Sequence, residues 1–153
     1  MDILTDRFKM GEDFTSKLEE LDMFSVRSFS EGDVIFKQGE SDASLYVIKS
    51  GAAKLTTHYV ASKIESPFLD IVAKSAIGAL SFLDGDIHKA SATAIVDTEV
   101  IEITQENFVR LNREHPEIAD GVMRLAIVAL QKMVSKLIIK YQEQELMLKG
   151  HIK

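Results

Sequence analysis

Residues whose side chains or backbone could bind a ligand or a metal gather in one stretch, residues 75–94, which reads SAIGALSFLDGDIHKASATA. Its glycines and small side chains have the outline of a loop that cradles a phosphate with backbone N–H groups. Such a loop normally carries charge at its centre, yet Ala79 and Ala90 occupy the middle of this one. Within the stretch only His88 and Lys89 could supply positive charge, so it is open at this point whether the loop binds an anionic ligand.

The same stretch contains three residue types that bind divalent metals. Asp84, Asp86 and His88 stand at alternate positions and could offer oxygen and nitrogen ligands. No further ligand and no calcium-loop spacing follows them, so a solvated turn around Gly85 is the favoured interpretation. We therefore predict no metal site and no bound cofactor.

Nucleophilic catalysis needs a Ser or Cys beside a His and a third, orienting group. The four histidines, His58, His88, His115 and His151, stand in unrelated contexts, and the chain has no cysteine and no glycine-rich nucleotide loop. We expect a protein that is not an enzyme, and a small enzyme using the residual pocket ranks lowest among the alternatives.

Composition narrows the class of protein further. A chain of 153 residues with 46% hydrophobic residues can form one domain with a real core. Its net charge of −6 argues against non-specific nucleic-acid binding. Without cysteine neither disulfides nor thiolate zinc sites can form, and no apolar run approaches the ~20 residues that cross a bilayer. We expect a cytoplasmic protein with no membrane partner.

Three patterns follow one another along the chain and set the predicted boundaries. Residues 1–28 form an N-terminal helical segment, with helical spacing of apolar residues over 14–23. Residues 29–103 alternate with a period of two between turn residues, which predicts a β barrel, roll or sandwich. Residues 104–153 return to helical spacing, and Pro116 ends one helix and begins the next.

The last predicted helix, residues 116–148, carries a heptad seam typical of a two-stranded coiled coil. The apolar seam residues are Met123, Ile127, Leu130, Val134, Leu137, Tyr141 and Leu148, and Gln144 occupies a further seam position. A second apolar group lies off the seam: Val122, Leu125, Ala126, Ala129, Met133, Ile138 and Ile139. Two apolar faces need two partners, so we expect the helix to pack on its own β domain and on a second copy, forming a homodimer. The alternative is a helix buried inside one monomer.

The segment FSEGDVIFKQGESDASLYVIKSGAAKL, residues 29–55, resembles the opening half of a cyclic nucleotide-binding domain. The similarity resumes at Ile77-Gly78 and at SATAIVDTEVIEITQENFVRLNREHPEI, so it spans about residues 29–118. The resemblance implies a mainly β fold with flanking helices, a double-stranded β-helix or jelly-roll-like β-roll. It also implies a long C-terminal helix, which bacterial regulators of this family use for dimerisation.

The family's phosphate-binding cassette carries a Phe-Gly-Glu-Leu/Ile motif, a short helix and a Pro-Arg-x-Ala-Thr motif. By resemblance, Ala79 stands where the Glu contacts the ribose, and Ala90 stands where the Arg pairs with the phosphate. Losing two charge-assisted hydrogen bonds would weaken binding by ~3–6 kcal/mol, so we expect no cyclic AMP binding in the usual family manner. The candidate pocket comprises Ile77, Gly78, Ala79, Leu80, Ser81, His88, Lys89, Ala90, Ser91, Ala92 and Thr93.

The sequence therefore predicts a non-enzymatic regulatory or interaction module that uses the roll as a scaffold and recognises a protein partner. One alternative is a sensor that holds a nucleotide through His88 or Lys89. Another is a sensor with a less charged ligand in an apolar cavity. Related transcription factors carry a helix-turn-helix domain after the long helix, whereas this chain ends at Lys153, so we expect no direct sequence-specific DNA binding.

Overall fold

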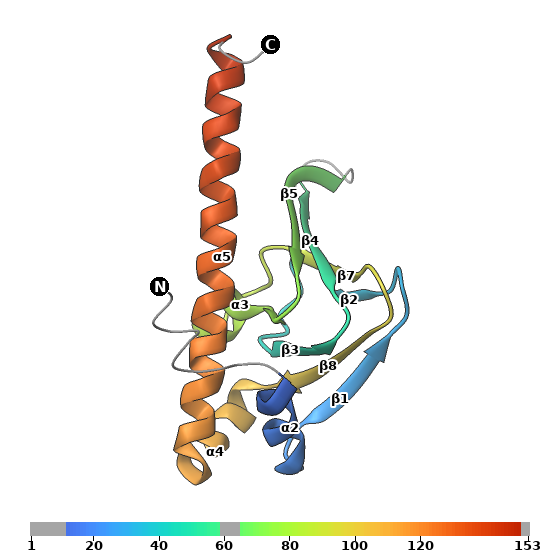
Figure 1. The fold of residues 1–153 in the computed structure, drawn as a ribbon, viewed down its shortest axis with the longest axis vertical. Coiled ribbons are helices and arrows are strands. Elements are labelled where there is room, and N and C mark those ends of the chain that lie inside the picture. Colours follow the sequence, from blue (N-terminus) through green and yellow to red (C-terminus); the bar gives the residue numbers. More distant parts are fainter. Residues whose placement is uncertain (1–11, 59–64, 151–153) are drawn as a thin grey trace.

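The structure is a computed structural model that describes residues 12–58 and 65–150 (Figure 1). The predicted N-terminal segment is therefore described only from residue 12 onward, and His151 also lies outside the described residues. The helices are α2 (Glu12–Glu20), α3 (Ala79–Asp84), α4 (Gln105–Glu114) and α5 (Pro116–Leu148). The strands are β1 (Ser25–Phe29), β2 (Val34–Phe36), β3 (Leu45–Ser50), β4 (Ala53–His58), β5 (Glu65–Ala73), β6 (Ala76–Ile77), β7 (Ser91–Ala94) and β8 (Thr98–Ile103).

The strands form two antiparallel four-stranded sheets, in the orders β1-β8-β3-β6 and β2-β7-β4-β5. Successive strands alternate between the sheets, except that β4 and β5 pair within one sheet, and the chain winds into a roll beside the long helix (Figure 1). At the β3–β4 turn Gly51 has φ 95°, and an added Cβ would overlap Thr98 Oγ1 and the backbone oxygen of Asp97, so only glycine fits there. The predicted mainly β fold with flanking helices is confirmed.

Two hydrophobic cores hold the roll and helices together. The first joins β3 and β8 to α2, α4 and α5, and includes Leu18, Leu45, Ile101, Leu111 and Val122. The second lies inside the roll and includes Phe36, Tyr46, Leu55, Ile77 and Ala92. The first core fixes α5 against the roll, which brings one face of this helix to the mouth of the second core.

The structure differs from the predicted boundaries at the start of the roll. Strand β1 begins at Ser25, inside the segment predicted as helical, and the predicted helix over 14–23 is α2, which ends at Glu20. β1 is an edge strand paired only with β8, and four of its five residues are exposed. An exposed edge strand need not alternate apolar and polar residues, so the period of two that marks the other strands is missing here.

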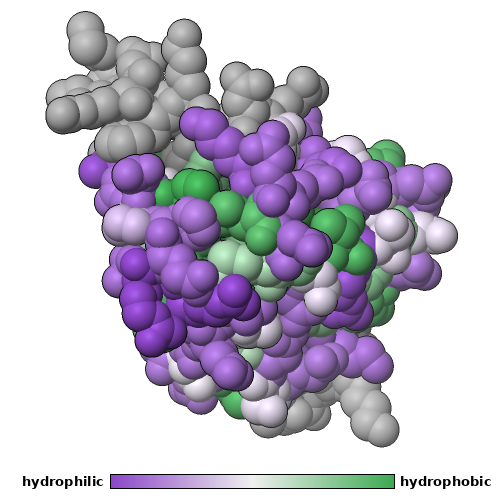
Figure 2. All heavy atoms as spheres, turned by 90° about the horizontal axis from the view of Figure 1, so that it is seen from below, coloured by the Kyte–Doolittle hydropathy of each residue, from purple (hydrophilic) through white to green (hydrophobic). Residues whose placement is uncertain are grey.

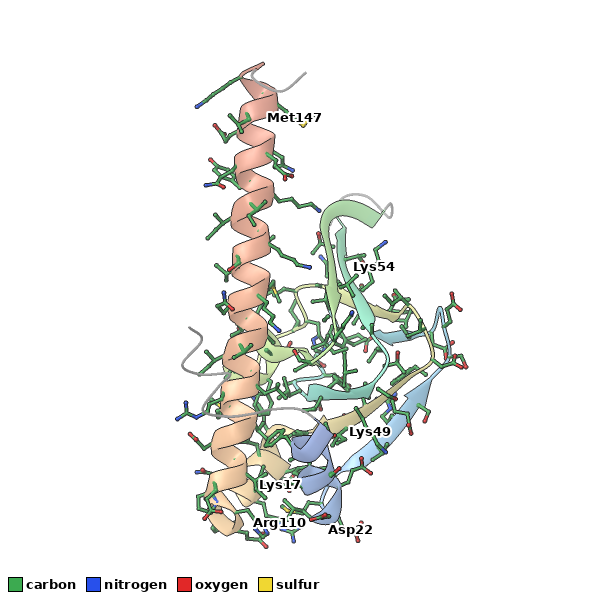
Figure 3. The ribbon with its side chains drawn as sticks, viewed as in Figure 1. Lys17, Asp22, Lys49, Lys54, Arg110 and Met147 are labelled. Carbon is green, nitrogen blue, oxygen red and sulfur yellow. The ribbon has the colours of Figure 1, made fainter. Side chains whose placement is uncertain are left out.

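The predicted break at Pro116 is confirmed. The Thr104 hydroxyl caps α4 by accepting a hydrogen bond from the backbone N–H of Asn107 at 3.0 Å. Helix α4 ends at Glu114, and α5 starts with Pro116 at its first position, where no N–H donor is needed. α5 then runs to Leu148, so its last turns extend past the roll, with Met147 near the far end (Figure 3).

The side chains of α5 divide between the roll and solvent. Ala119, Val122, Leu125 and Ala126 are buried, and the predicted seam residues Met123, Leu130 and Leu137 pack partly against the two cores. The other apolar seam residues are exposed and, together with Ile138, form what we call the α5 strip: Ile127, Val134, Ile138, Tyr141 and Leu148. The seam thus splits into residues that contact the roll and residues that face solvent, and Ile138 and Ile139 of the second apolar group do not reach the core.

Other large apolar side chains are exposed outside the α5 strip, among them Val109, Ile139 and Met147. Figure 2 looks onto the molecule from below and shows apolar side chains gathered across the middle of this face, with hydrophilic side chains around them. Apolar atoms contribute much of the surface of folded proteins in general. No helix in the described part of the chain is both long enough and apolar enough to cross a membrane.

Candidate functional site

A sharp turn at Gly78 connects β6 to α3 and starts the candidate site. Gly78 has φ 84°, and a Cβ added to it would lie 2.7 Å from the backbone oxygen of Ser44. The turn therefore needs both the left-handed conformation and the small size of glycine. It places Ala79 and Ser81, both buried, at the start of α3 beneath α5.

A cavity of about 180 Å³ lies between this turn, the segment before β7 and α5. We call it the cassette cavity; its lining residues are Phe36, Leu55, Thr57, Gly78, Ala79, Leu80, Ser81, His88, Lys89, Ala90, Met133 and Leu137. Seven of these belong to the predicted pocket, so the fold brings together most of that set. The wall is mainly apolar, and His88 and Lys89 are its only ionisable residues.

His88 is almost completely enclosed in this wall, with 2% of its side chain exposed. Two backbone hydrogen bonds hold it in place: its N–H donates to Glu40 O at 2.9 Å, and its carbonyl accepts from Gly39 N–H at 2.8 Å. Its ring stacks on Phe36, with centroids 3.8 Å apart. Nε2 has no hydrogen-bond partner among the described residues and lies 3.8 Å from Asp42 Oδ2.

Comparison with known proteins accounts for this arrangement of turn, short helix and roll. The sequence profile of the cyclic nucleotide-binding domain matches residues 26–115 of this chain. The chain belongs to the cyclic nucleotide-binding domain family.

Individual relatives point to regulators that contain this domain. The chain is 30% identical over 111 residues to the cyclic AMP receptor protein of Thermus thermophilus, covering 70% of this chain and 51% of the relative. It is 30% identical over 99 residues to the transcriptional activator protein Anr of Pseudomonas protegens, covering 65% and 40%. The chain thus spans about half or less of these relatives.

Solved structures agree on the fold. The crystal structure of the Thermus thermophilus catabolite activator protein matches with a TM-score of 0.63 at 23% identity, covering 92% of this chain and 70% of that one. The domain also occurs in enzymes: a cyclic-GMP-dependent phosphodiesterase of Dictyostelium discoideum is 25% identical, but the match covers only 12% of it.

In this cyclic nucleotide-binding domain, burial and their mutual contacts shift the pKa values of His88, Asp42 and Tyr46. Burial lowers the pKa of His88, and the nearby Asp42 carboxylate only partly opposes this. Burial raises the pKa of Asp42, but hydrogen bonds from the Tyr46 hydroxyl and Ser44 outweigh it, so that pKa is lowered overall. Burial and the bond to Asp42 raise the pKa of Tyr46. At neutral pH His88 therefore offers the cavity a neutral imidazole rather than a cation.

Lys89 and the two aspartates face outward in the loop before β7. Lys89 Nζ donates to Asp86 Oδ2 at 3.1 Å and to the carbonyl of Ile87 at 3.3 Å. Asp84 accepts a hydrogen bond from the backbone N–H of Asp86 at 2.8 Å. His88 points the other way, into the wall, so the three predicted metal-type residues do not converge. Within residues 12–58 and 65–150, no three His, Asp or Glu side chains group as metal ligands.

The remaining residues of the predicted pocket have structural roles in the core and strands of the domain. Ile77 is buried in the inner core, and so is Ala92. Thr93 pairs with Val34 and Lys54 across β7. The Ser91 hydroxyl accepts from Gln38 N–H at 2.9 Å and ties β7 to the loop after β2. These four residues shape the site without lining the cassette cavity.

Sequence reasoning missed five residues of the cavity wall: Phe36, Leu55, Thr57, Met133 and Leu137. Met133 and Leu137 stood among the apolar residues of the long helix, and Leu137 was assigned to the dimer seam. Their four-residue spacing indicates one helix face. Only the position of α5 on the roll shows that this face closes the cavity.

Proposed function

We propose that this chain is a non-enzymatic regulatory module that pairs with a second copy of itself through the α5 strip. The observation that carries the proposal is the dual role of α5: it closes the cassette cavity with Met133 and Leu137, and a neighbouring side of the helix, roughly a quarter turn away, exposes Ile127, Val134 and Tyr141. Exposed apolar residues at heptad spacing favour pairing with another helix. The cytoplasm is the compartment expected for such a module.

The second part of the proposal is that cyclic AMP does not bind in the family's usual manner. Ala79 and Ala90, matched in sequence to the family's glutamate and arginine, place only methyl groups at the cavity wall. Lys89 is engaged by Asp86, and burial keeps His88 neutral near pH 7, so neither replaces a guanidinium for a phosphate. The roll then acts as a scaffold for α5 and for a protein partner.

A specific observation favours one alternative, a small-ligand sensor. The unpartnered Nε2 of His88 belongs to a residue in the wall of a largely apolar cavity. A weakly charged ligand there would contact both the cassette and α5. It could then favour one position of the helix over another, which is how a ligand shifts a regulator between states.

Thermal unfolding with millimolar cyclic AMP or cyclic GMP tests the cassette. We expect no shift for the natural chain, and a rise of several degrees for Ala79→Glu combined with Ala90→Arg, because ligand at ~100 times its Kd adds ~2.7 kcal/mol. The matched control is the double variant without nucleotide, which reports any change in intrinsic stability. A clear rise in the unfolding temperature of the natural chain would contradict the proposal that its cassette does not bind cyclic nucleotide, and would support the sensor alternative.

A further inference from the structure

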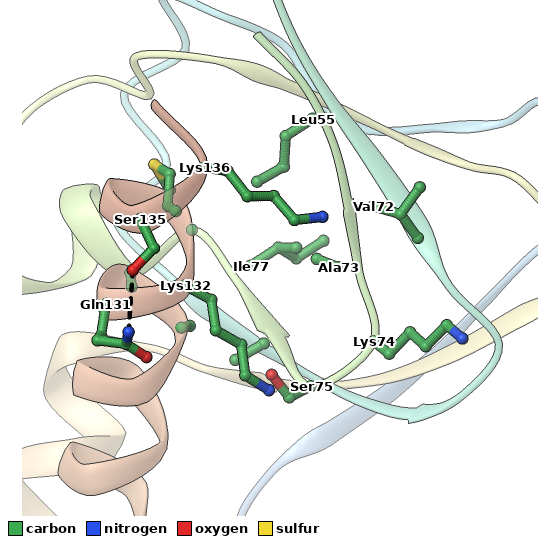
Figure 4. A pocket seen from close by; sticks show the side chains of 15 residues that line it. Leu55, Val72, Ala73, Lys74, Ser75, Ile77, Gln131, Lys132, Ser135 and Lys136 are labelled. Atoms are coloured by element: carbon green, nitrogen blue, oxygen red, sulfur yellow. Dashed lines mark hydrogen bonds between the residues drawn. The ribbon is translucent and has the colours of Figure 1, made fainter. Parts of the chain in front are cut away.

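A second and larger cavity, of about 420 Å³, lies beside the first between α5 and the strands β5 and β6 (Figure 4). Its apolar wall includes Leu55, Val72, Ala73, Ile77 and Met133. Polar side chains stand along α5 at its edge, where Gln131 Nε2 donates to Ser135 Oγ at 3.0 Å. The volume falls within the range of small-molecule sites, about 300–1,000 Å³.

Two lysines of α5 give this cavity its charge, and we call it the lysine cavity. Lys132 and Lys136 stand one helical turn apart, and both side chains extend from α5 across the cavity toward β5 and β6 (Figure 4). Lys74, on the loop after β5, points away from it (Figure 4). The cavity is thus apolar on its floor and cationic on its helix side.

Among the side chains that the structure describes, which leave out those of residues 58–71, no carboxylate forms an ion pair with either lysine. The ion pairs found there join other residues, such as Lys89 with Asp86 and Arg124 with Asp120. The helix positions three and four residues from Lys132 hold Val128, Ala129, Ser135 and Lys136. Like charges one turn apart repel each other. An anion between the two ammonium groups would remove that repulsion and gain two charge-assisted hydrogen bonds.

We propose that the lysine cavity binds an amphipathic organic anion, whose carboxylate or phosphate lies between Lys132 and Lys136. Its apolar chain or ring packs against Leu55, Ile77 and Met133. This ligand is held by charge from the helix rather than by charge from the cassette. The inference goes beyond the proposed function and does not depend on cyclic nucleotide binding.

The lysine cavity and the α5 strip lie on opposite sides of the helix. Lys136 follows Ile127 by nine residues, about two and a half turns, which places them about 180° apart. Pairing through the strip therefore leaves the lysines accessible. Met133 lines both cavities, so an occupant of the lysine cavity also touches the wall of the cassette cavity.

Calorimetric titration of the full chain with octanoate tests the site, with 1-octanol as the uncharged probe and acetate as the head group alone. We expect octanoate to bind, the other two to bind at least tenfold more weakly, and the affinity for octanoate to fall with salt. Lys132→Gln with Lys136→Gln should weaken octanoate at least tenfold. The matched control, Lys149→Gln, removes an exposed lysine at the end of the same helix and should leave affinity unchanged.

NMR spectra of the methionine methyl groups locate the bound probe. The chain has six methionines; Met133 borders the lysine cavity, whereas Met147 lies near the end of α5 (Figure 3). We expect the Met133 methyl signal to move with octanoate while Met147 stays in place. Equal binding of octanol, equal affinity in the double variant, equal movement of both methyls, or no octanoate binding at millimolar concentration would each overturn the inference. Sedimentation of the same samples reports dimerisation separately, so failure here leaves the pairing proposal standing.

Discussion

The imidazole of His88 lies flat against the ring of Phe36, with the two ring planes inclined by only 11°. Phe36 also stacks on Tyr46, with centroids 5.7 Å apart, and the Tyr46 hydroxyl donates a hydrogen bond to Asp42. Both ends of this row of rings lie near the same carboxylate, because His88 Nε2 is 3.8 Å from Asp42 Oδ2. Two of the rings, Phe36 and His88, line the cassette cavity together with Ala79 and Ala90.

Acid should destabilise the protein through His88. Because burial lowers its pKa in the folded state, the unfolded chain binds a proton more readily below about pH 6.5. The stabilising contribution is therefore complete above that pH and is lost as the pH falls toward the folded-state value. We expect the free energy of unfolding to decrease between pH 7 and 5, and the decrease to be smaller in His88→Gln.

Urea unfolding at several pH values measures this dependence, and NMR titration of the His88 ring measures its midpoint in the folded state. Asp42, whose pKa is also lowered, contributes its own loss of stability below about pH 4, outside this window. A folded-state midpoint for His88 at or above about 6.5 would contradict the prediction.

Gly78→Ala should destabilise the protein more than Gly39→Ala. Both glycines have positive φ, 84° and 94°, so alanine at either costs about 1–2 kcal/mol in backbone strain. Only Gly78 also faces a backbone oxygen, that of Ser44, whereas the Cβ direction of Gly39 is open within 4 Å. We expect about 1 kcal/mol or more of additional loss for Gly78→Ala in urea unfolding, since a rigid overlap must be relieved. If both variants lose the same free energy of unfolding, the backbone at Gly78 shifts enough to relieve the overlap, and the prediction is wrong.

Val134→Glu should split the proposed homodimer without harming the roll. Val134 is 52% exposed and lies in the α5 strip, and two-fold pairing would bring two such carboxylates together in an apolar seam. We expect at least about a tenfold weaker dimer by sedimentation velocity.

Val109→Glu is the matched control for this change, because Val109 is 64% exposed on α4 and outside the strip. Leu130→Glu, which the heptad seam alone would suggest, is less specific, since Leu130 also packs against the first core. If the Val134→Glu protein forms a dimer as tight as that of the natural chain, the α5 strip is not the dimer interface.

Local patterns and the family resemblance together predicted the fold class. The period of two over residues 29–103 indicated a β barrel, roll or sandwich, the resemblance implied a roll, and Pro116 marked the start of α5 correctly. The alternation follows from the geometry of a strand, which points successive side chains to opposite faces, and the break at Pro116 follows from backbone sterics, so both leave a mark in the local sequence. Strand β1 was missed because an exposed edge strand carries no such alternation.

The sequence by itself determined the composition of the cassette: alanine at 79 and 90, and His88 beside Lys89. Only the tertiary structure decided how these residues are used, because neighbouring side chains before β7 point to opposite sides. His88 turns inward onto Phe36 while Lys89 pairs with Asp86 outside. The structure alone also decided which residues of α5 close the cassette cavity, which form the strip and which give charge to the lysine cavity. Those assignments depend on how the helix sits on the roll, through contacts between residues tens of positions apart that a local pattern does not encode.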